Sequence, residues 1–223
     1  MKFRHEIKHE INYSDMLALR QTLKATAKPD EHSCNGKYFI RSLYFDNIYD
    51  KALKEKINGV NNREKFRIRF YNNDKSYIRL EKKSKTNGLC SKKTANLSEE
   101  QARLISKGDY SCLKNSADPL LAEFYSKIKS QGLKPKTIVD YTREAFVYPA
   151  GNVRITLDYN IRTGLCCTDF LNNDCVTIPI MGAPIILEVK WDEFLPTVIS
   201  NAVGLKNRRS SAFSKYSICR IYD

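Results

Sequence analysis

Residues 63–71 alternate cationic and apolar side chains. This alternation predicts a β-strand, because successive side chains of a strand point to opposite faces. Four cations on one face repel one another unless water or an anion lies among them. The chemistry open to such a face is anion binding, and the alternative for a single strand is a solvated outer surface. The cations are Arg63, Lys65, Arg67 and Arg69, and the apolar residues opposite them are Phe66, Ile68 and Phe70.

Charged faces recur on other segments that alternate in the same way, and several of them also carry carboxylates. A site for a metal-bound phosphate chain needs both kinds of group, cations for the phosphate oxygens and carboxylates for Mg²⁺ or Mn²⁺. For any single carboxylate, a neutralising pair with a neighbouring cation is the alternative. The further charged faces are formed by Arg4, Glu6 and Lys8; by Arg79, Glu81 and Lys83; by Arg143; by Arg154 and Asp158; and by Glu188 and Lys190.

The composition narrows the class of partner. The 223 residues carry a formal net charge of +13, and the basic residues are spread along the chain. Such an excess indicates an acidic partner, which is a nucleic acid, a membrane surface or a polyanionic small substrate. A hydrophobic content of 42% predicts a real core and excludes a disordered chain.

The seven cysteines are odd in number and include no C-x-x-C pair. This pattern favours free thiols in a reducing compartment over a disulfide framework or a zinc site. Cys166 and Cys167 are interpreted as buried or loop thiols rather than as a redox site. The start of the chain lacks the apolar stretch of a signal peptide, and the most apolar segment, residues 178–187, is too short to span a membrane. We therefore expect a soluble, cytoplasmic protein, with docking on a membrane partner left open.

Periodicity and capping signals predict the elements that position the charged faces. Helices are expected at 14–28, 48–57, 98–107, 118–132 and 192–203. Strands are expected at 3–11, 37–46, 63–71, 76–83, 89–95, 136–148, 152–162, 184–191 and 215–222. Residues 207–211, which include Arg208 and Arg209, are expected to form a basic loop, either solvated or guiding phosphate. This order predicts one domain over residues 1–223, of the α+β class with a mainly antiparallel sheet.

A sheet of about eight strands tends to curl or close. The helices must pack on its apolar face, which leaves the charged face turned the other way. Closure would give a water-filled lumen ringed by cations and carboxylates, whereas an open sheet would give a flat basic surface. The carboxylates among the cations favour closure, because a surface for nucleic acid gains little from them.

Taken together, these segments resemble the VTC domain, the polyphosphate polymerase branch of the triphosphate tunnel metalloenzyme superfamily. Each segment is a weak signal alone, but jointly they follow the family's order over nearly the whole chain. The segments are residues 4–8, 40–46, 63–69, 80–85, 154–158, 187–190 and 214–216.

The resemblance implies an antiparallel β-barrel tunnel of about eight strands with helices packed outside and a basic interior. It implies a polyphosphate polymerase that transfers the γ-phosphate of ATP to a growing chain, with Mn²⁺ or Mg²⁺ as cofactor. The residues implied in catalysis and phosphate binding are Lys8, Arg67, Arg69, Lys83, Arg154 and Lys215. Arg143, Arg162 and Lys190 are further implied phosphate ligands. Glu188 is the implied metal ligand, and Glu6 or Glu81 would assist it or pair with tunnel cations.

The chain departs from the hydrolytic relatives at one position. Those relatives begin with E-x-E-x-K, and this chain has Arg4 at the first glutamate. The change removes a metal carboxylate and adds a cation, which favours the polymerase branch. The alternatives are a tripolyphosphatase or nucleoside triphosphatase with the same site, and a non-catalytic module that binds polyphosphate or nucleic acid. The expected ligands are ATP or triphosphate and polyphosphate, and no nucleic acid is expected.

Overall fold

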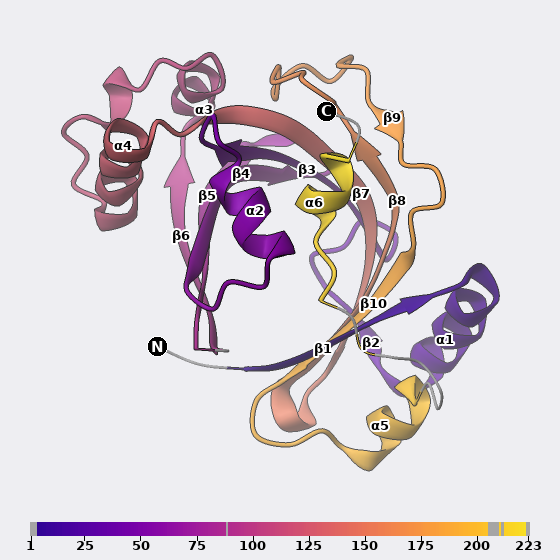
Figure 1. The fold of residues 1–223 in the computed structure, drawn as a ribbon. Helices are drawn as coiled ribbons and strands as arrows, with labels where there is room; N and C mark the ends of the chain where they lie inside the picture. Colours follow the sequence, from indigo (N-terminus) through magenta and orange to yellow (C-terminus); the bar gives the residue numbers. More distant parts are fainter. Residues whose placement is uncertain (1–3, 88, 205–209, 211, 222–223) are drawn as a thin grey trace.

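The computed structural model describes residues 4–87, 89–204, 210 and 212–221. Its main feature is an antiparallel sheet with the strand order β1-β10-β8-β7-β3-β4-β5-β6, which curls into a half-barrel (Figure 1). The short strands β2 (Lys28–Pro29) and β9 (Ile178–Pro179) pair with β7 and β8. The long strands are β1 (His5–Ile11), β3 (Lys37–Asp46), β4 (Arg63–Tyr71), β5 (Asp74–Thr86), β6 (Leu89–Leu97), β7 (Lys134–Tyr148), β8 (Val153–Thr163) and β10 (Ile185–Trp191). The predicted α+β fold with a curled antiparallel sheet of about eight strands is confirmed.

Helices cover the convex side of the half-barrel in two groups (Figure 1). The first group is α3 (Glu99–Ser106) and α4 (Pro119–Gln131), with the 3-10 turn Ser111–Leu113 between them. The second group is α1 (Tyr13–Thr26) and α5 (Thr197–Val203). None of the helices in the described ranges is long and apolar enough to cross a membrane.

The apolar faces of the strands form the core beneath these helices. Phe66, Ile68 and Phe70 of β4 are at most 2% exposed, and the ring of Phe66 lies 5.1 Å from that of Phe124 in α4. A second cluster joins Leu19 and Leu23 of α1 to the outer faces of β8 and β10. Because side chains alternate along a strand, burying this face turns the charged residues toward the concave side.

Capping signals in the sequence place several helix ends. Asp118 caps α4 and is followed by Pro119 at the first helical position, and Ser98 forms a capping box with Gln101 at the start of α3, both as predicted. Helix α1 begins at Tyr13, one residue earlier than expected, and Asn12 is its N-cap. Helix α5 begins at Thr197, after Pro196, and not at residue 192.

Two short helices lie on the concave side, near one end of the half-barrel (Figure 1). They are α2 (Lys51–Ile57) and α6 (Lys215–Cys219). Helix α2 begins three residues later than expected, because Asp50 adopts a left-handed conformation with φ of 53°. The predicted strand at 215–222 is wrong over its described part. Ser214 caps a helical turn there, and Tyr216 and Cys219 at helical spacing are buried against the inner face of the sheet. Tyr222 lies outside the described residues.

The buried carboxylate of Asp46 links the end of β3 to both helices. It accepts hydrogen bonds from the backbone N–H groups of Ala52 and Leu53 in α2, at 2.9 and 3.1 Å. It also accepts one from the Tyr216 hydroxyl in α6, at 2.9 Å. The Tyr216 ring stacks on Tyr44 at 4.9 Å between centroids. Together these contacts hold α6 inside the half-barrel.

We predict that Tyr216→Phe lowers the free energy of unfolding by about 2 kcal/mol, because a hydrogen bond to a buried charged group is lost. Urea unfolding followed by circular dichroism measures this change. Tyr49→Phe is the matched control, since Tyr49 is 71% exposed and its loss should change little. Equal stability of the two variants would contradict the role given to Tyr216.

Candidate functional site

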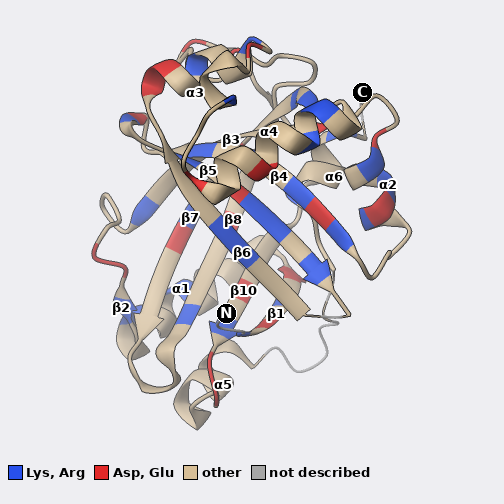
Figure 2. Cartoon of the chain, turned by 90° about the vertical axis from the view of Figure 1, so that its left-hand side faces the viewer, with Lys and Arg blue, Asp and Glu red and all other residues tan. Residues whose placement is uncertain are grey.

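The concave face gathers charged residues from seven strands and from the start of α6. Lys and Arg recur along the strands of the curled sheet (Figure 2). The strand register places them side by side, with Arg67 opposite Glu81, Lys65 opposite Lys83, Lys8 opposite Glu188 and Lys190 opposite Arg154. We call the following set the concave cluster: Lys8, Lys65, Arg67, Arg69, Lys83, Lys92, Arg143, Lys190 and Lys215, with Glu6, Glu81, Asp158 and Glu188.

One wall of the cluster is built around Glu81, which is 1% exposed. Nε and Nη2 of Arg67 donate to Glu81 Oε2 at 2.7 and 2.5 Å, and Nζ of Lys92 lies 2.5 Å from Oε1. Nη1 of Arg69 lies 3.8 Å from Oε2. Burial raises the pKa of Glu81, but Arg67, Arg69 and Lys92 outweigh this and hold it well below its usual value. Both carboxylate oxygens therefore serve to hold cations.

Hydroxyl groups accept further hydrogen bonds from the two arginines on this wall and so fix their orientation. Nη1 of Arg67 donates to the Tyr44 hydroxyl at 2.7 Å. Nε of Arg69 donates to Ser42 Oγ, and its Nη2 to the Tyr141 hydroxyl, both at 3.0 Å. The guanidinium groups are thus fixed before any ligand arrives, which is what a preorganised anion site requires.

The opposite wall is built around Asp158, which is fully buried. Arg143 donates to both of its oxygens, from Nε at 2.6 Å and from Nη2 at 2.7 Å. Lys215 Nζ donates to Oδ2 at 2.6 Å. Burial raises the pKa of Asp158, but Arg143 and Lys215 bring it down to about 2. Lys215 therefore joins the cluster from a helix and not from the predicted strand.

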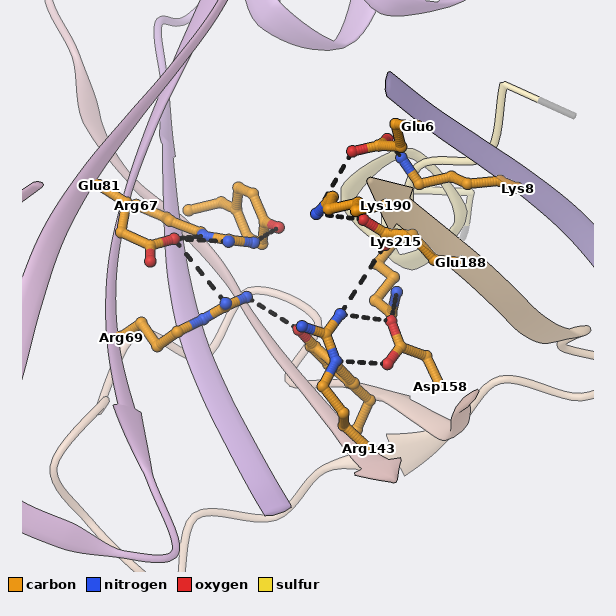
Figure 3. A network of polar contacts seen from close by, with 12 residues as sticks. Glu6, Lys8, Arg67, Arg69, Glu81, Arg143, Asp158, Glu188, Lys190 and Lys215 are labelled. Carbon is orange, nitrogen blue, oxygen red and sulfur yellow. Dashed lines mark hydrogen bonds and ion pairs between the residues drawn. The ribbon is translucent and has the colours of Figure 1, made fainter. Parts of the chain in front are cut away.

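Glu188 and Glu6 lie beside this wall on β10 and β1 (Figure 3). Lys190 Nζ forms an ion pair with Glu188 and lies 3.3 Å from Glu6 Oε2, and Lys8 pairs with Glu6. Nη2 of Arg143 lies 3.9 Å from Glu188. Glu188 is 6% exposed, yet Lys190, Lys8 and Arg143 hold its pKa well below the usual value against the effect of burial.

Lys65 and Lys83 differ from the other cations of the cluster, because neither forms an ion pair with a carboxylate in the described ranges. Burial lowers the pKa of Lys65 to about 8, and the charges of Arg67 and Lys8 add to this effect. Burial also lowers the pKa of Lys83 well below its usual value, helped by Arg67 on its own wall and Lys190 on the other. Neutralisation by an anion would remove this repulsion.

The structure brings most of the sequence-predicted residues together, with two exceptions. Arg154 lies next to Lys190 but forms an ion pair with Asp30 at 2.7 Å. Arg162 lies apart from the cluster, on the opposite face of β8 from the inward-packed Ile161, and donates to Thr177 Oγ1 at 2.9 Å. Arg208 and Arg209 lie outside the described residues.

Sequence reasoning missed several members of the cluster. Lys65 was noted only as part of the charged face of residues 63–71, but it is half-buried beside Lys83. Lys92 on β6 was not considered, although Cys90, Lys92 and Thr94 alternate on the inner face. Asp158 was noted only as part of a charged face. The signal that identifies Lys65 and Lys92 is strand register, which the sequence alone does not provide.

The carboxylates offer limited means to hold a metal ion. In the described part of the chain, no three His, Cys, Asp or Glu side chains are grouped as a metal site. Glu81 and Asp158 are each saturated by cations. The carboxylates that remain as candidate metal ligands are Glu188 and Glu6, which share Lys190 as an ion-pair partner. One or two carboxylates suit a hard divalent ion that takes its other ligands from phosphate oxygens and water.

The cluster holds nine cations and four carboxylates, and its chemistry is therefore the binding of a polyanion.

We predict that the Lys65 side chain titrates at about 8 in the free protein and at a higher pH with tripolyphosphate, because a nearby anion favours the charged amine. Lysine ε-carbon NMR measures this, with the Lys65 resonance assigned by its loss in Lys65→Arg. A titration that tripolyphosphate leaves unchanged would contradict anion binding at this position.

Comparisons with known proteins agree with the fold and identify the family. No curated protein matches the chain in sequence. A Vibrio parahaemolyticus protein described as a "putative adenylate cyclase" has a TM-score of 0.53 at 12% identity, with 97% of each chain covered. The PH1819 protein of Pyrococcus horikoshii OT3 has a TM-score of 0.50 at 12% identity, covering 96% of this chain and 94% of that chain. At these identities the two structures share the fold alone. The VTC domain family model matches residues 3–221, and the chain therefore belongs to the VTC domain family.

Proposed function

We propose that this protein is an ATP-dependent polyphosphate polymerase, which transfers the γ-phosphate of ATP to a growing polyphosphate chain on the concave face. Membership of the VTC domain family supports an enzyme that acts on triphosphates. The observation that carries the proposal is the excess of cations in a partly buried cluster. Lys65 and Lys83 in particular have pKa values that burial and neighbouring cations lower, and a bound anion would raise them.

The arrangement of the cations suits a chain of phosphates better than a single phosphate. Arg67 and Arg69 project from one side of the half-barrel, and Lys190 and Arg143 project from the other (Figure 3). Lys83 experiences the charges of Arg67 and of Lys190 at once, so the two walls are close enough to act on one ligand. Successive phosphate groups lying between the walls would each meet cations on both sides.

Phosphoryl transfer needs positioning and charge neutralisation more than covalent help from the protein. We infer that Arg67, Arg69 and Arg143 bind non-bridging oxygens, since carboxylates already orient Arg67 and Arg143 and hydroxyl groups orient Arg69. Lys65, Lys83 and Lys8 would neutralise the charge that develops on the transferred group and on the leaving diphosphate. Their amines lie on flexible stems, so they can follow the phosphates as the chain advances.

Glu188, with Glu6 beside it, is the residue that would hold Mn²⁺ or Mg²⁺. When bound, such an ion would neutralise part of the charge on the phosphate oxygens. Lys190 occupies both carboxylates in the present structure. Binding of a phosphate chain would give the Lys190 amine another anionic partner and leave Glu188 free to take a metal. The carboxylate of Glu81 keeps its structural role.

The position of Arg4 favours transfer over hydrolysis. Arg4 lies just before β1, and its Nε is 2.8 Å from Asp192 Oδ1. The position that is a glutamate in the hydrolytic relatives therefore adds no carboxylate to the concave cluster. With fewer carboxylates, the site has less capacity to activate a water molecule. We further propose that residues 1–223 act as one domain on ATP and polyphosphate, without nucleic acid, in the cytoplasm.

Incubation with ATP and Mn²⁺, followed by ³¹P NMR, tests the reaction. We expect signals of internal chain phosphates to grow as the signals of ATP decline. Free phosphate alone would identify a hydrolase, and tight polyphosphate binding without turnover would identify a binding module. Glu188→Gln should abolish turnover if a metal acts at Glu188, whereas a binding module would tolerate this variant.

We predict that Arg69→Met weakens tripolyphosphate binding by about 10- to 100-fold, the loss expected for one charge-assisted hydrogen bond. The fold should persist, because Glu81 keeps Arg67 and Lys92 as partners. Isothermal titration calorimetry measures the dissociation constant. Arg162→Met is the matched control, since it removes the same charge from the other face of the sheet. Equal losses in the two variants would mean that only net charge matters and that the cluster forms no defined site.

A further inference from the structure

Two thiols meet in the segment between β8 and β9, on the convex side of the sheet. Sγ of Cys167 and Sγ of Cys175 lie 2.9 Å apart. Both side chains are half-buried, whereas the neighbouring Cys166 is exposed. Both sulfur atoms pack against the core cluster under α3 and α4, which is separate from the concave cluster.

A series of turns creates this approach. The N–H of Gly164 donates to the carbonyl of Ile138 at 2.8 Å, and the N–H of Cys167 donates to the carbonyl of Gly164 at 2.9 Å. Further along, the N–H of Cys175 donates to the carbonyl of Asn172 at 3.2 Å. The backbone thus reverses between the two cysteines and returns the second sulfur to the first.

The same segment is anchored to the sheet, so the approach does not depend on a loose loop. Phe170, between the two cysteines, is fully buried, and its ring lies 4.8 Å from that of Phe70 in β4. Nη1 of Arg41 donates to the carbonyl of Asn172 at 2.6 Å, and Arg41 is itself paired with buried Asp140. The two sulfur atoms are therefore held close by packing on both sides of the turn.

We propose that Cys167 and Cys175 are a modification site at which a reversible intramolecular disulfide forms. The oxidant is a low-molecular-mass disulfide such as oxidised glutathione. The Cys167 thiolate attacks one sulfur of the oxidant, the oxidant's S–S bond breaks, and one thiol leaves. The Cys175 thiolate then attacks Cys167 in this mixed disulfide, and the second thiol leaves. Two cysteine thiols are oxidised, the two sulfurs of the oxidant are reduced, and the two protons end on the released thiols.

The order of attack follows from the surroundings of the two thiols. Burial and the hydrogen bond with Cys167 raise the pKa of Cys175 to about 12, although Arg41 opposes this. A raised pKa makes Cys175 a poor first nucleophile, and we therefore assign it the second step, after Cys167 has been converted to a mixed disulfide. The disulfide would restrict the unfolded chain and so stabilise the folded protein. Because the segment lies on the convex side, tripolyphosphate binding on the concave face should be unchanged.

The test uses the full chain with Cys166→Ser, which removes the exposed neighbouring thiol. The protein is treated with oxidised glutathione at pH 8.5 or with dithiothreitol, alkylated, and cut before aspartate residues. These cuts place Cys167 in residues 158–168 and Cys175 in residues 174–191. We expect the two peptides to be joined after oxidation, with a mass 2 Da below their sum, and separate after reduction. The melting temperature should rise by about 5 °C on oxidation.

The matched control is the same chain with Cys175→Ser added, which should show neither the joined peptides nor the rise in melting temperature. Mixed disulfides with glutathione, links between two chains, or unreacted thiols at residues 167 and 175 would each overturn the proposal. An unchanged dissociation constant for tripolyphosphate after oxidation would show that the site acts apart from the concave face. These outcomes do not depend on polymerase activity, so the proposed function and the disulfide can fail independently.

Discussion

The concave face depends on ion pairs in which one buried carboxylate holds two or three cations. Glu81 and Asp158 are almost fully enclosed, and each holds two or three cationic groups. Removing such groups from water costs several kcal/mol per ion, and close pairing with good hydrogen bonds must offset that cost. Without Glu81, the positive charges of Arg67 and Arg69, which lie side by side on β4, would repel each other with no carboxylate to neutralise them. The strands could then not bring their charged faces together in a curled sheet.

This arrangement divides the cations by task. The arginines donate to carboxylates and hydroxyl groups, which fixes their geometry and leaves their remaining N–H groups for phosphate oxygens. Among the described residues, Lys65 and Lys83 have no carboxylate partner, and burial together with neighbouring cations lowers their pKa values. Functional sites commonly keep unfavourable features that a ligand relieves. Here the unfavourable feature is electrostatic, and a bound anion would relieve it whichever reaction follows.

The outer face of the same sheet is governed by packing. Phe66, Phe70 and Phe124 belong to an apolar core whose packing involves none of the charged residues of the inner face. The two faces are one residue apart along each strand, and a shift of register by one would exchange them. That is why alternation in the sequence was enough to predict both the core side of β4 and the charged side. The capping residues Asp118 and Ser98 were equally readable, because caps act through local hydrogen bonds.

The sequence failed where distant contacts override local pattern. Residues 215–222 alternate well enough to resemble a strand, but Lys215–Cys219 form a helix that Asp46 and Tyr44, which are distant in sequence, hold in place. Arg162 shares its spacing with Arg154 and Asp158, yet a register irregularity between β7 and β8 places Arg162 on the other face. A bulge adds one residue to a strand and thereby reverses the side to which the following residues point. Beyond such an irregularity, residue numbers alone do not tell which face of the strand a side chain lies on. A charged residue there must be located in the fold before it is given a role.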